Sequence, residues 1–175
     1  MKFISVDVEA NGPIPGDYSM ICFGAVVVEP ELNRTFYGRV RPVNLNCVPE
    51  ALEISGFTMD QTMEFDLPDL IIPKFYKWLL EIKKTVPIIF ISDNPAFDWQ
   101  FINYYLWHFC KGNPFGHSAR RIGDLYCGLV KKINANKNWK RKYRKTRHDH
   151  SPLNDAIGNA EAIMTIFDIH GIALQ

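Results

Sequence analysis

Two carboxylates near the N-terminus are the first residues whose types and spacing could do chemistry. Residues 3–9 (FISVDVE) have the alternating apolar pattern of a β-strand, and successive side chains of a strand point to opposite faces. Asp7 and Glu9 therefore share the polar face, with their Cα atoms about 7 Å apart. Two like charges beside a core are costly unless a cation lies between them. The pair thus indicates a cation site, provided that other parts of the chain supply further ligands.

Two helix starts could supply those ligands. Residues 94–98 (NPAFD) and 151–155 (SPLND) each carry a capping residue, a proline at the first helical position and an aspartate four residues after the cap. The side chains of Asn94 and Ser151 are predicted to cap the free backbone N–H groups. Asp98 and Asp155 then project from the first turn, where the helix dipole favours negative charge. Either aspartate alone is explained by the dipole, but two such segments together favour a shared site.

Four converging carboxylates would repel one another unless cations neutralised them. Magnesium prefers oxygen ligands, and two ions about 4 Å apart can clamp the attacking and leaving oxygens of a phosphodiester. His150 lies five residues before Asp155, and its imidazole could take a proton from the attacking water. His148 and Asp149 leave that assignment open. His148 and His150 could also chelate zinc, although no cysteine or further histidine nearby completes such a set.

The elements that must position these residues follow from periodicity. Apolar patterns predict strands at residues 3–9, 20–28, 34–40 and 87–92, with a brief strand at 122–123. They also predict a short helix near residue 49 followed by a loop, and longer helices from residue 67, over 95–109, from an Asp124 N-cap to 132, and from residue 152. The order β-β-β-α-β-α-β-α predicts an α/β domain with a mixed central sheet.

Composition adds few constraints. The 175 residues suit one domain, 1–175, and 47% hydrophobic with 22% charged residues is typical of soluble globular proteins. Four cysteines without paired spacing indicate reduced thiols and a cytoplasmic protein. No stretch approaches the roughly 20 apolar residues of a membrane span, so no membrane partner is expected.

Three segments together resemble a known family. In order, they are an apolar strand ending in Asp7-x-Glu9, a helix start Asn94-x-x-x-Asp98, and His150-x-x-x-x-Asp155. In this combination, which spans nearly the whole chain, they resemble the DEDDh 3′–5′ exonucleases, a family with a ribonuclease H-like fold. Its members include ribonuclease T, oligoribonuclease and bacterial proofreading exonucleases.

The resemblance implies a role for each motif residue. Asp7, Glu9 and Asp155 would hold the metal ion that carries the attacking water, Asp7 would bridge to a second ion with Asp98, and His150 would be the general base. The two ions would be Mg²⁺ or Mn²⁺. The expected reaction releases 5′-mononucleotides from the 3′ end of single-stranded RNA or DNA. Because relatives are commonly dimers, a homodimer is possible.

A basic segment precedes His150. Seven of the eleven residues 137–147 are Lys or Arg, with Trp139 and Tyr143 interleaved, a composition that suits phosphate binding and base stacking. A mobile solvated loop is the alternative. Met20 and Phe57 are candidates to pack against the terminal base, or they belong to the core. The full set of predicted nucleic-acid contacts is Ala10, Asn11, Met20, Phe57, Asn94, Lys140, Arg141, Arg144 and Lys145.

Two other functions fit parts of the sequence. An oligoribonuclease-like enzyme acting on short RNA is one, although residues 10–13 (ANGP) depart from the Met-Thr-Gly type found after that motif in oligoribonucleases. A non-catalytic nucleic-acid-binding module on the same fold is the other, and the complete set of five site residues argues against it. No sequence feature separates RNA from DNA.

Overall fold

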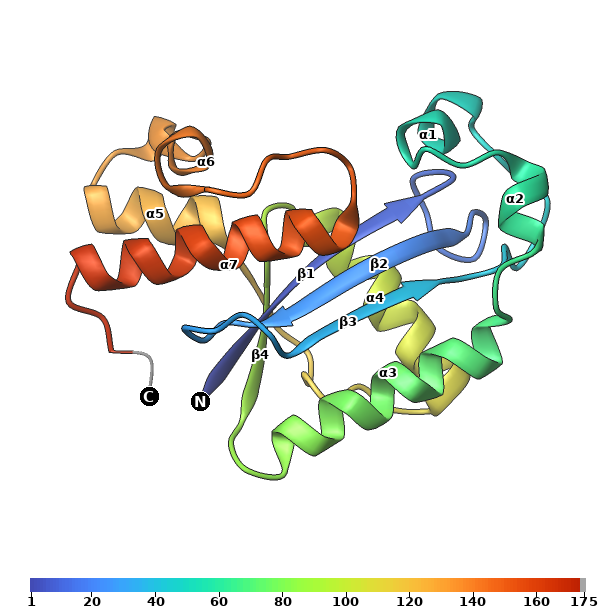
Figure 1. Ribbon diagram of the computed structural model, residues 1–175, viewed down its shortest axis with the longest axis horizontal. Helices are drawn as coiled ribbons and strands as arrows, with labels where there is room; N and C mark the ends of the chain where they lie inside the picture. Colours follow the sequence, from blue (N-terminus) through green and yellow to red (C-terminus); the bar gives the residue numbers. More distant parts are fainter. Residues whose placement is uncertain (174–175) are drawn as a thin grey trace.

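Five strands form one mixed sheet in the computed structural model, which describes residues 1–173 (Figure 1). The strands are β1 (Lys2–Ala10), β2 (Met20–Val27), β3 (Thr35–Arg39), β4 (Ile88–Ser92) and β5 (Ala119–Arg121). Their order is β3-β2-β1-β4-β5, so β1 is central, antiparallel to β2 and parallel to β4. The mixed sheet confirms the predicted α/β class.

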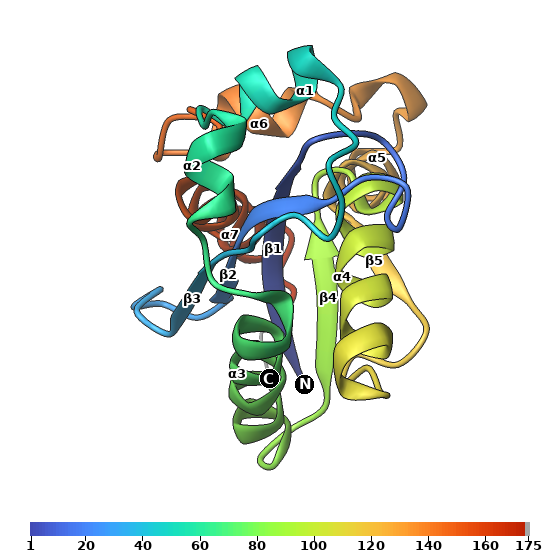
Figure 2. The ribbon, with the colours of Figure 1, turned by 90° about the vertical axis from the view of Figure 1, so that its right-hand side faces the viewer.

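Helices cover both faces of this sheet. The helices of the described residues are α1 (Pro49–Ile54), α2 (Met59–Met63), α3 (Pro68–Lys83), α4 (Pro95–Cys110), α5 (Ile122–Val130), the 3₁₀ helix η1 (Ile133–Ala135), α6 (Asn138–Tyr143) and α7 (Pro152–Ile169). Helices α3 and α4 lie on one face, and α5, α6 and α7 lie on the other (Figures 1 and 2). Across residues 1–173, no helix has both the length and the apolar character needed to cross a membrane.

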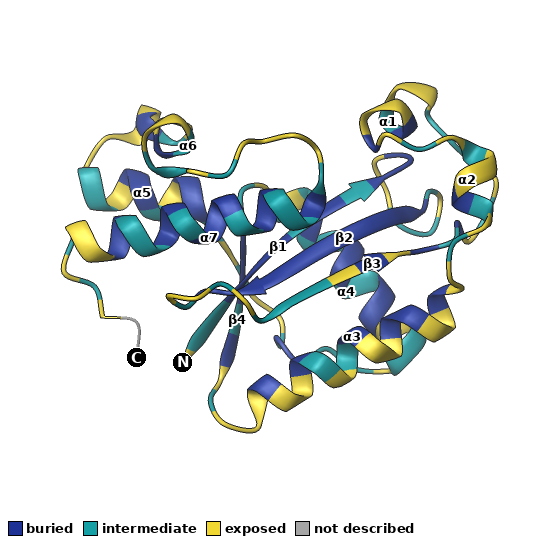
Figure 3. Ribbon diagram, viewed as in Figure 1, coloured by how far each residue is buried: buried dark blue, intermediate teal, exposed yellow. Residues whose placement is uncertain are grey.

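The core has two parts, one on each face of the sheet. Ile4, Val6 and Val8 of β1 pack with α3 and α4, as the strand alternation predicts. On the other face, Val26 and Ile91 pack with α5, α6 and α7. Every residue of β2 is buried, so this strand has core on both sides (Figure 3). Packing on both faces of the sheet therefore holds β1 and β2 in place where β1 carries Asp7 and Glu9.

Several local predictions were wrong. The brief strand is β5, which begins three residues before the predicted 122–123 and pairs only with β4 at the edge of the sheet. The buried Ile122 is already the first residue of α5. Asp124 consequently lies in the first turn of α5 and is not its N-cap. Helix α2, capped by Thr58 and Gln61, replaces the predicted loop after α1. Asn94 and Ser151 occupy N-cap positions, but their side chains make no capping hydrogen bond.

The basic segment is more ordered than a solvated loop. Residues Asn138–Tyr143 form α6, and Trp139 is fully buried, donating a hydrogen bond from Nε1 to the Asn136 carbonyl at 2.9 Å. Trp139 therefore anchors the segment to the α7 face of the core, so the prediction that it stacks on bases was wrong. Tyr143 is half-buried, 6.0 Å from the Tyr126 ring.

Candidate active site

The carboxylates of β1 lie beneath the start of α7. Asp7 pairs in register with Gly24 of β2. A Cβ atom on Gly24 would stand 2.4 Å from the Cα and N atoms of Leu153, the second residue of α7. Only glycine allows this approach, which brings the first turn of α7, and with it Asp155, over the polar face of β1.

Asp98 reaches the same region from the other side of β1. It lies in the first turn of α4, which follows β4, and its Oδ1 accepts a hydrogen bond from the Val8 backbone N–H at 3.2 Å. Val8 stands between Asp7 and Glu9, so this bond ties α4 to the strand that carries both carboxylates. The Asp98 residue is only 4% exposed.

The predicted carboxylates come together. Ligand atoms of Asp7, Glu9 and Asp155 all lie within 4.8 Å of one another, and Asp98 is adjacent. Burial, followed by the charges of Asp98, Asp155 and Glu9, raises the pKa of Asp7 well above its usual value. Burial, together with Asp155 and Asp98, raises the pKa of Glu9 to about 8. Burial also raises the pKa of Asp98 to about 7.

These features fit a site for divalent cations. The carboxylates repel one another, and the single charge of Arg144, 2.7 Å from Asp155, offsets only part of that repulsion, which is the condition that a hard cation relieves. Oδ2 of Asp155 is buried without a hydrogen-bond partner, whereas Oδ1 is fully engaged. A buried oxygen left free in this way is suited to bind an ion.

Two histidines, rather than one, face the carboxylates. His150 Nδ1 lies 3.5 Å from Glu9 Oε1, and His148 Nδ1 lies 2.7 Å from Asp155 Oδ1. Both side chains are 49% exposed, so each also faces solvent. His150 has a φ angle of 59°, a left-handed conformation that is uncommon for a residue with a side chain and recurs at functional sites. The sequence raised His148 only as a competing neighbour and did not predict its contact with Asp155.

Arg144 is part of the site rather than of its exposed rim. Its side chain is 7% exposed, and its guanidinium lies 2.7 Å from Asp155 Oδ1 and 3.4 Å from Asn159 Oδ1. Gly158 of α7 makes room for it, since a Cβ there would meet Arg144 Nε at 2.6 Å. The sequence grouped Arg144 with the surface cations and gave no signal of this ion pair.

The other predicted nucleic-acid contacts divide into two groups. Asn94, Arg141 and Lys145 are exposed, and the half-buried Lys140 forms an ion pair with Asp93. The remaining four, closer to the core, are Ala10, Asn11, Met20 and Phe57.

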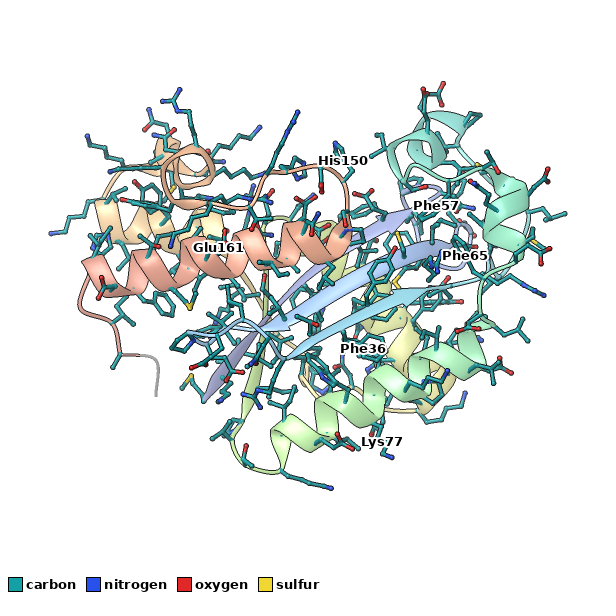
Figure 4. All side chains as sticks on the ribbon, viewed as in Figure 1. Phe36, Phe57, Phe65, Lys77, His150 and Glu161 are labelled. Carbon is teal, nitrogen blue, oxygen red and sulfur yellow. The ribbon has the colours of Figure 1, made fainter. Side chains whose placement is uncertain are left out.

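Three of those four are buried. The Asn11 side chain accepts from the Ser19 N–H and donates to the Asn46 carbonyl, which places it in loop structure. Met20 is fully buried in the core cluster of α3 and α4, the core position that the sequence left open. Phe57 is half-buried, edge-on to Phe65 at 5.0 Å (Figure 4).

Comparison with known proteins gives a relative in sequence and several in fold. No protein-family model matches the chain. A curated relative, the 3′–5′ DNA exonuclease Cap18 of Escherichia coli, is 37% identical over 130 residues, covering 73% of this chain and 68% of Cap18.

Solved structures agree in fold. The nuclease domain of 3′hExo, a DEDDh family member bound to rAMP, matches with a TM-score of 0.76 at 18% identity, covering 96% of this chain and 92% of that one. The zinc-bound complex of E. coli ExoI with single-stranded DNA matches with a TM-score of 0.72 at 16% identity, covering 96% of this chain and 40% of that one. Because the identity to Cap18 extends over two-thirds of both proteins and the fold is that of DEDDh nucleases, this chain belongs to the DEDDh family of 3′–5′ exonucleases.

Proposed function

We propose that this exonuclease uses divalent metal ions to hydrolyse single-stranded DNA from its 3′ end, releasing 5′-mononucleotides. The observation that carries the proposal is the convergence of four carboxylates from β1, α4 and α7, with Asp155 Oδ2 buried and unpartnered. Neither an oligonucleotide-specific ribonuclease nor a pure binding module accounts for this cluster together with a DNA exonuclease relative.

The carboxylates would hold the ions. Asp7, Glu9 and Asp155 form one ligand set, and Asp98 would complete a second with Asp7. When bound, Mg²⁺ or Mn²⁺ would stabilise the negative charge that develops on the attacking and leaving oxygens. The raised pKa values of Asp7, Glu9 and Asp98 mean that these groups would release protons when a cation binds.

His150 would act as the general base. Its Nδ1 is within 3.5 Å of Glu9 Oε1, so the carboxylate can orient the ring, and its exposed edge is open to water. In this role the imidazole accepts the proton of the attacking water and returns it to solvent between turnovers.

The basic segment would bind the phosphate backbone of the strand. Its side chains line a hollow of about 300 Å³ that extends from Lys140 through Arg147 to His148. Basic residues at the edge of the catalytic carboxylates would hold a polyanion without reading its bases. DNA is preferred over RNA in this proposal because the relative that is 37% identical is a DNA exonuclease.

A product ladder tests the reaction. The protein is incubated with 5′-labelled single-stranded DNA and RNA of equal sequence, with Mg²⁺ or with excess chelator. We expect shortening from the 3′ end, faster on DNA, and no hydrolysis in chelator. Full activity in chelator would refute the metal mechanism, and faster RNA cleavage would reassign the substrate.

Substitution of each histidine tests the base. His150→Ala is expected to lower kcat by about 10²–10⁴-fold with little change in DNA binding. His148→Ala should have a mild effect. Single-turnover rates and binding titrations separate the two quantities, and the reverse pattern would make His148 the base.

A further inference from the structure

We propose that His148, His150 and Asp155 form a site for a transition-metal ion of the Zn²⁺ type, and that zinc bound there inhibits the nuclease. One ligand atom from each of these three residues lies within 4.8 Å of the other two. The two imidazoles come from an H-x-H pair in the loop before α7, and the carboxylate comes from the first turn of α7. The sequence left this pair without a third ligand, and the fold supplies Asp155.

The ligand types select the ion. Imidazole nitrogen suits zinc, copper and nickel, whereas magnesium prefers oxygen ligands. Two histidines and one carboxylate are also the protein ligand set of several zinc sites, in which water takes the fourth position. This site therefore differs in chemistry from the set of Asp7, Glu9 and Asp155, although both sets share Asp155.

The distance between His148 and Asp155 is close to the one that zinc requires, and the atoms of all three residues lie within 4.8 Å of one another. Ligand atoms around a tetrahedral zinc ion stand about 3.3 Å apart, whereas His148 Nδ1 and Asp155 Oδ1 are 2.7 Å apart. Binding zinc between these two atoms needs an opening of about 0.6 Å. The rings of His148 and His150 are 4.5 Å apart between centroids, and both are half-exposed. Such side chains can make this adjustment.

The loop that carries the histidines is already held in place. Glu161 of α7 accepts hydrogen bonds from the backbone N–H groups of Lys145 and Thr146 and from the Thr146 hydroxyl. At the other end, Asp149 accepts from the Ser151 N–H and from the Asn154 side chain. Figure 4 shows Glu161 on α7 below this loop and His150 where the loop descends to the start of α7. A metal ion would thus meet ligands that need little further ordering.

Charge also permits a cation here. The Arg144 guanidinium lies 2.7 Å from Asp155 and carries one positive charge. Against its single charge stand the carboxylates of Asp155, Glu9 and Asp7, which lie together. The surroundings therefore remain net negative when all are ionised.

Inhibition follows from the residues involved and rests on the proposed function. Zinc would occupy the lone pair of His150 that the proposed base needs, and it would draw on the carboxylate of Asp155. Hydrolysis supported by Mg²⁺ should therefore stop when this site is filled.

Zinc binding is tested first without substrate. Metal-free protein is titrated with Zn²⁺ against a chromophoric chelator, and X-ray absorption counts the imidazoles on the bound ion. Wild type should show two imidazole ligands, and His148→Ala should weaken zinc binding at least about tenfold while Mn²⁺ binding is unchanged. His117→Ala, an exposed histidine in the loop before β5, is the matched control and should bind zinc as wild type does. Equal zinc affinity in His148→Ala, or an ion with oxygen ligands alone, would overturn the site.

Inhibition is tested separately. Hydrolysis is measured at fixed Mg²⁺ and increasing zinc, relative to each variant's own rate without zinc. The zinc concentration that halves this rate should rise in His148→Ala by the same factor as the dissociation constant for zinc. An unchanged value would overturn the inhibitory role. Because binding is measured without substrate, a failed nuclease assay would leave the zinc site standing, and a failed titration would leave the nuclease standing.

Discussion

Replacing Arg144 with methionine should destabilise the metal-free protein strongly. The Arg144 side chain is 7% exposed and that of its partner Asp155 is 1% exposed, with 2.7 Å between Nη2 and Oδ1. Removing one member of a buried ion pair leaves the other charge uncompensated, at a cost of about 3–5 kcal/mol. For a domain of this size, 1 kcal/mol changes Tm by about 2–4 °C. The expected loss is therefore about 6–20 °C.

The assay is thermal unfolding in excess chelator at neutral pH. Arg141→Met is the matched control, because Arg141 lies in the same basic segment with an exposed side chain, and its Tm should change by about 2 °C or less. Adding Mg²⁺ should raise the Tm of Arg144→Met more than that of wild type, because the ion replaces the lost positive charge near Asp155.

Two results would contradict a stabilising ion pair between Arg144 and Asp155. If Arg144→Met and Arg141→Met unfold at the same temperature, the ion pair contributes nothing to the fold, and Arg144 is better described as one of the surface cations. If Mg²⁺ stabilises both variants equally, Arg144 and the ion do not act on the same carboxylate.

Three further predictions concern the same site. Folding raises the pKa of Glu9 from 4.5 to about 8, so between these pH values the folded chain binds more protons than the unfolded chain. The free energy of unfolding without metal should therefore fall as the pH rises from 4.5 to 8. Denaturant titrations measure this free energy, and a rise with pH would contradict the prediction. Gly24→Ala should lower stability by about 1–3 kcal/mol and activity further, as α7 is pushed off β2, whereas Gly128→Ala, with open space at its Cβ, should be neutral or stabilising. Neutralising Lys140, Arg141 and Lys145 should reduce the slope of the logarithm of the DNA-binding constant against the logarithm of the salt concentration by about 1 to 2. An unchanged slope would mean that these side chains do not contact the DNA phosphates.

The carboxylate site was predictable because each of its parts is encoded locally. Strand alternation places Asp7 and Glu9 on one face whatever the rest of the chain does. A proline at the first helical position marks where α4 and α7 begin, so Asp98 and Asp155 had to lie in first turns, even though the predicted side-chain caps do not form. The motif spacing then required only that these elements meet.

The remainder of the site depends on contacts between distant residues. The Arg144 side chain is buried because Gly158, three residues beyond Asp155 on α7, leaves space for its guanidinium. Trp139 is buried because α6 packs against α7. Within the basic segment, composition alone gives Arg144 and Arg141 the same role, and tertiary packing separates them.

The two oxygens of Asp155 explain why one carboxylate can serve two different kinds of ion. Oδ1 already contacts both Arg144 and His148, whereas Oδ2 is buried without a partner. A hard cation can use Oδ2 without breaking any existing contact, so its affinity should not depend on His148. Zinc held by the histidines takes His148 as a ligand and must enter its contact with Oδ1, so its affinity must depend on His148. The dependence on His148 therefore distinguishes the ions that support hydrolysis from those that stop it.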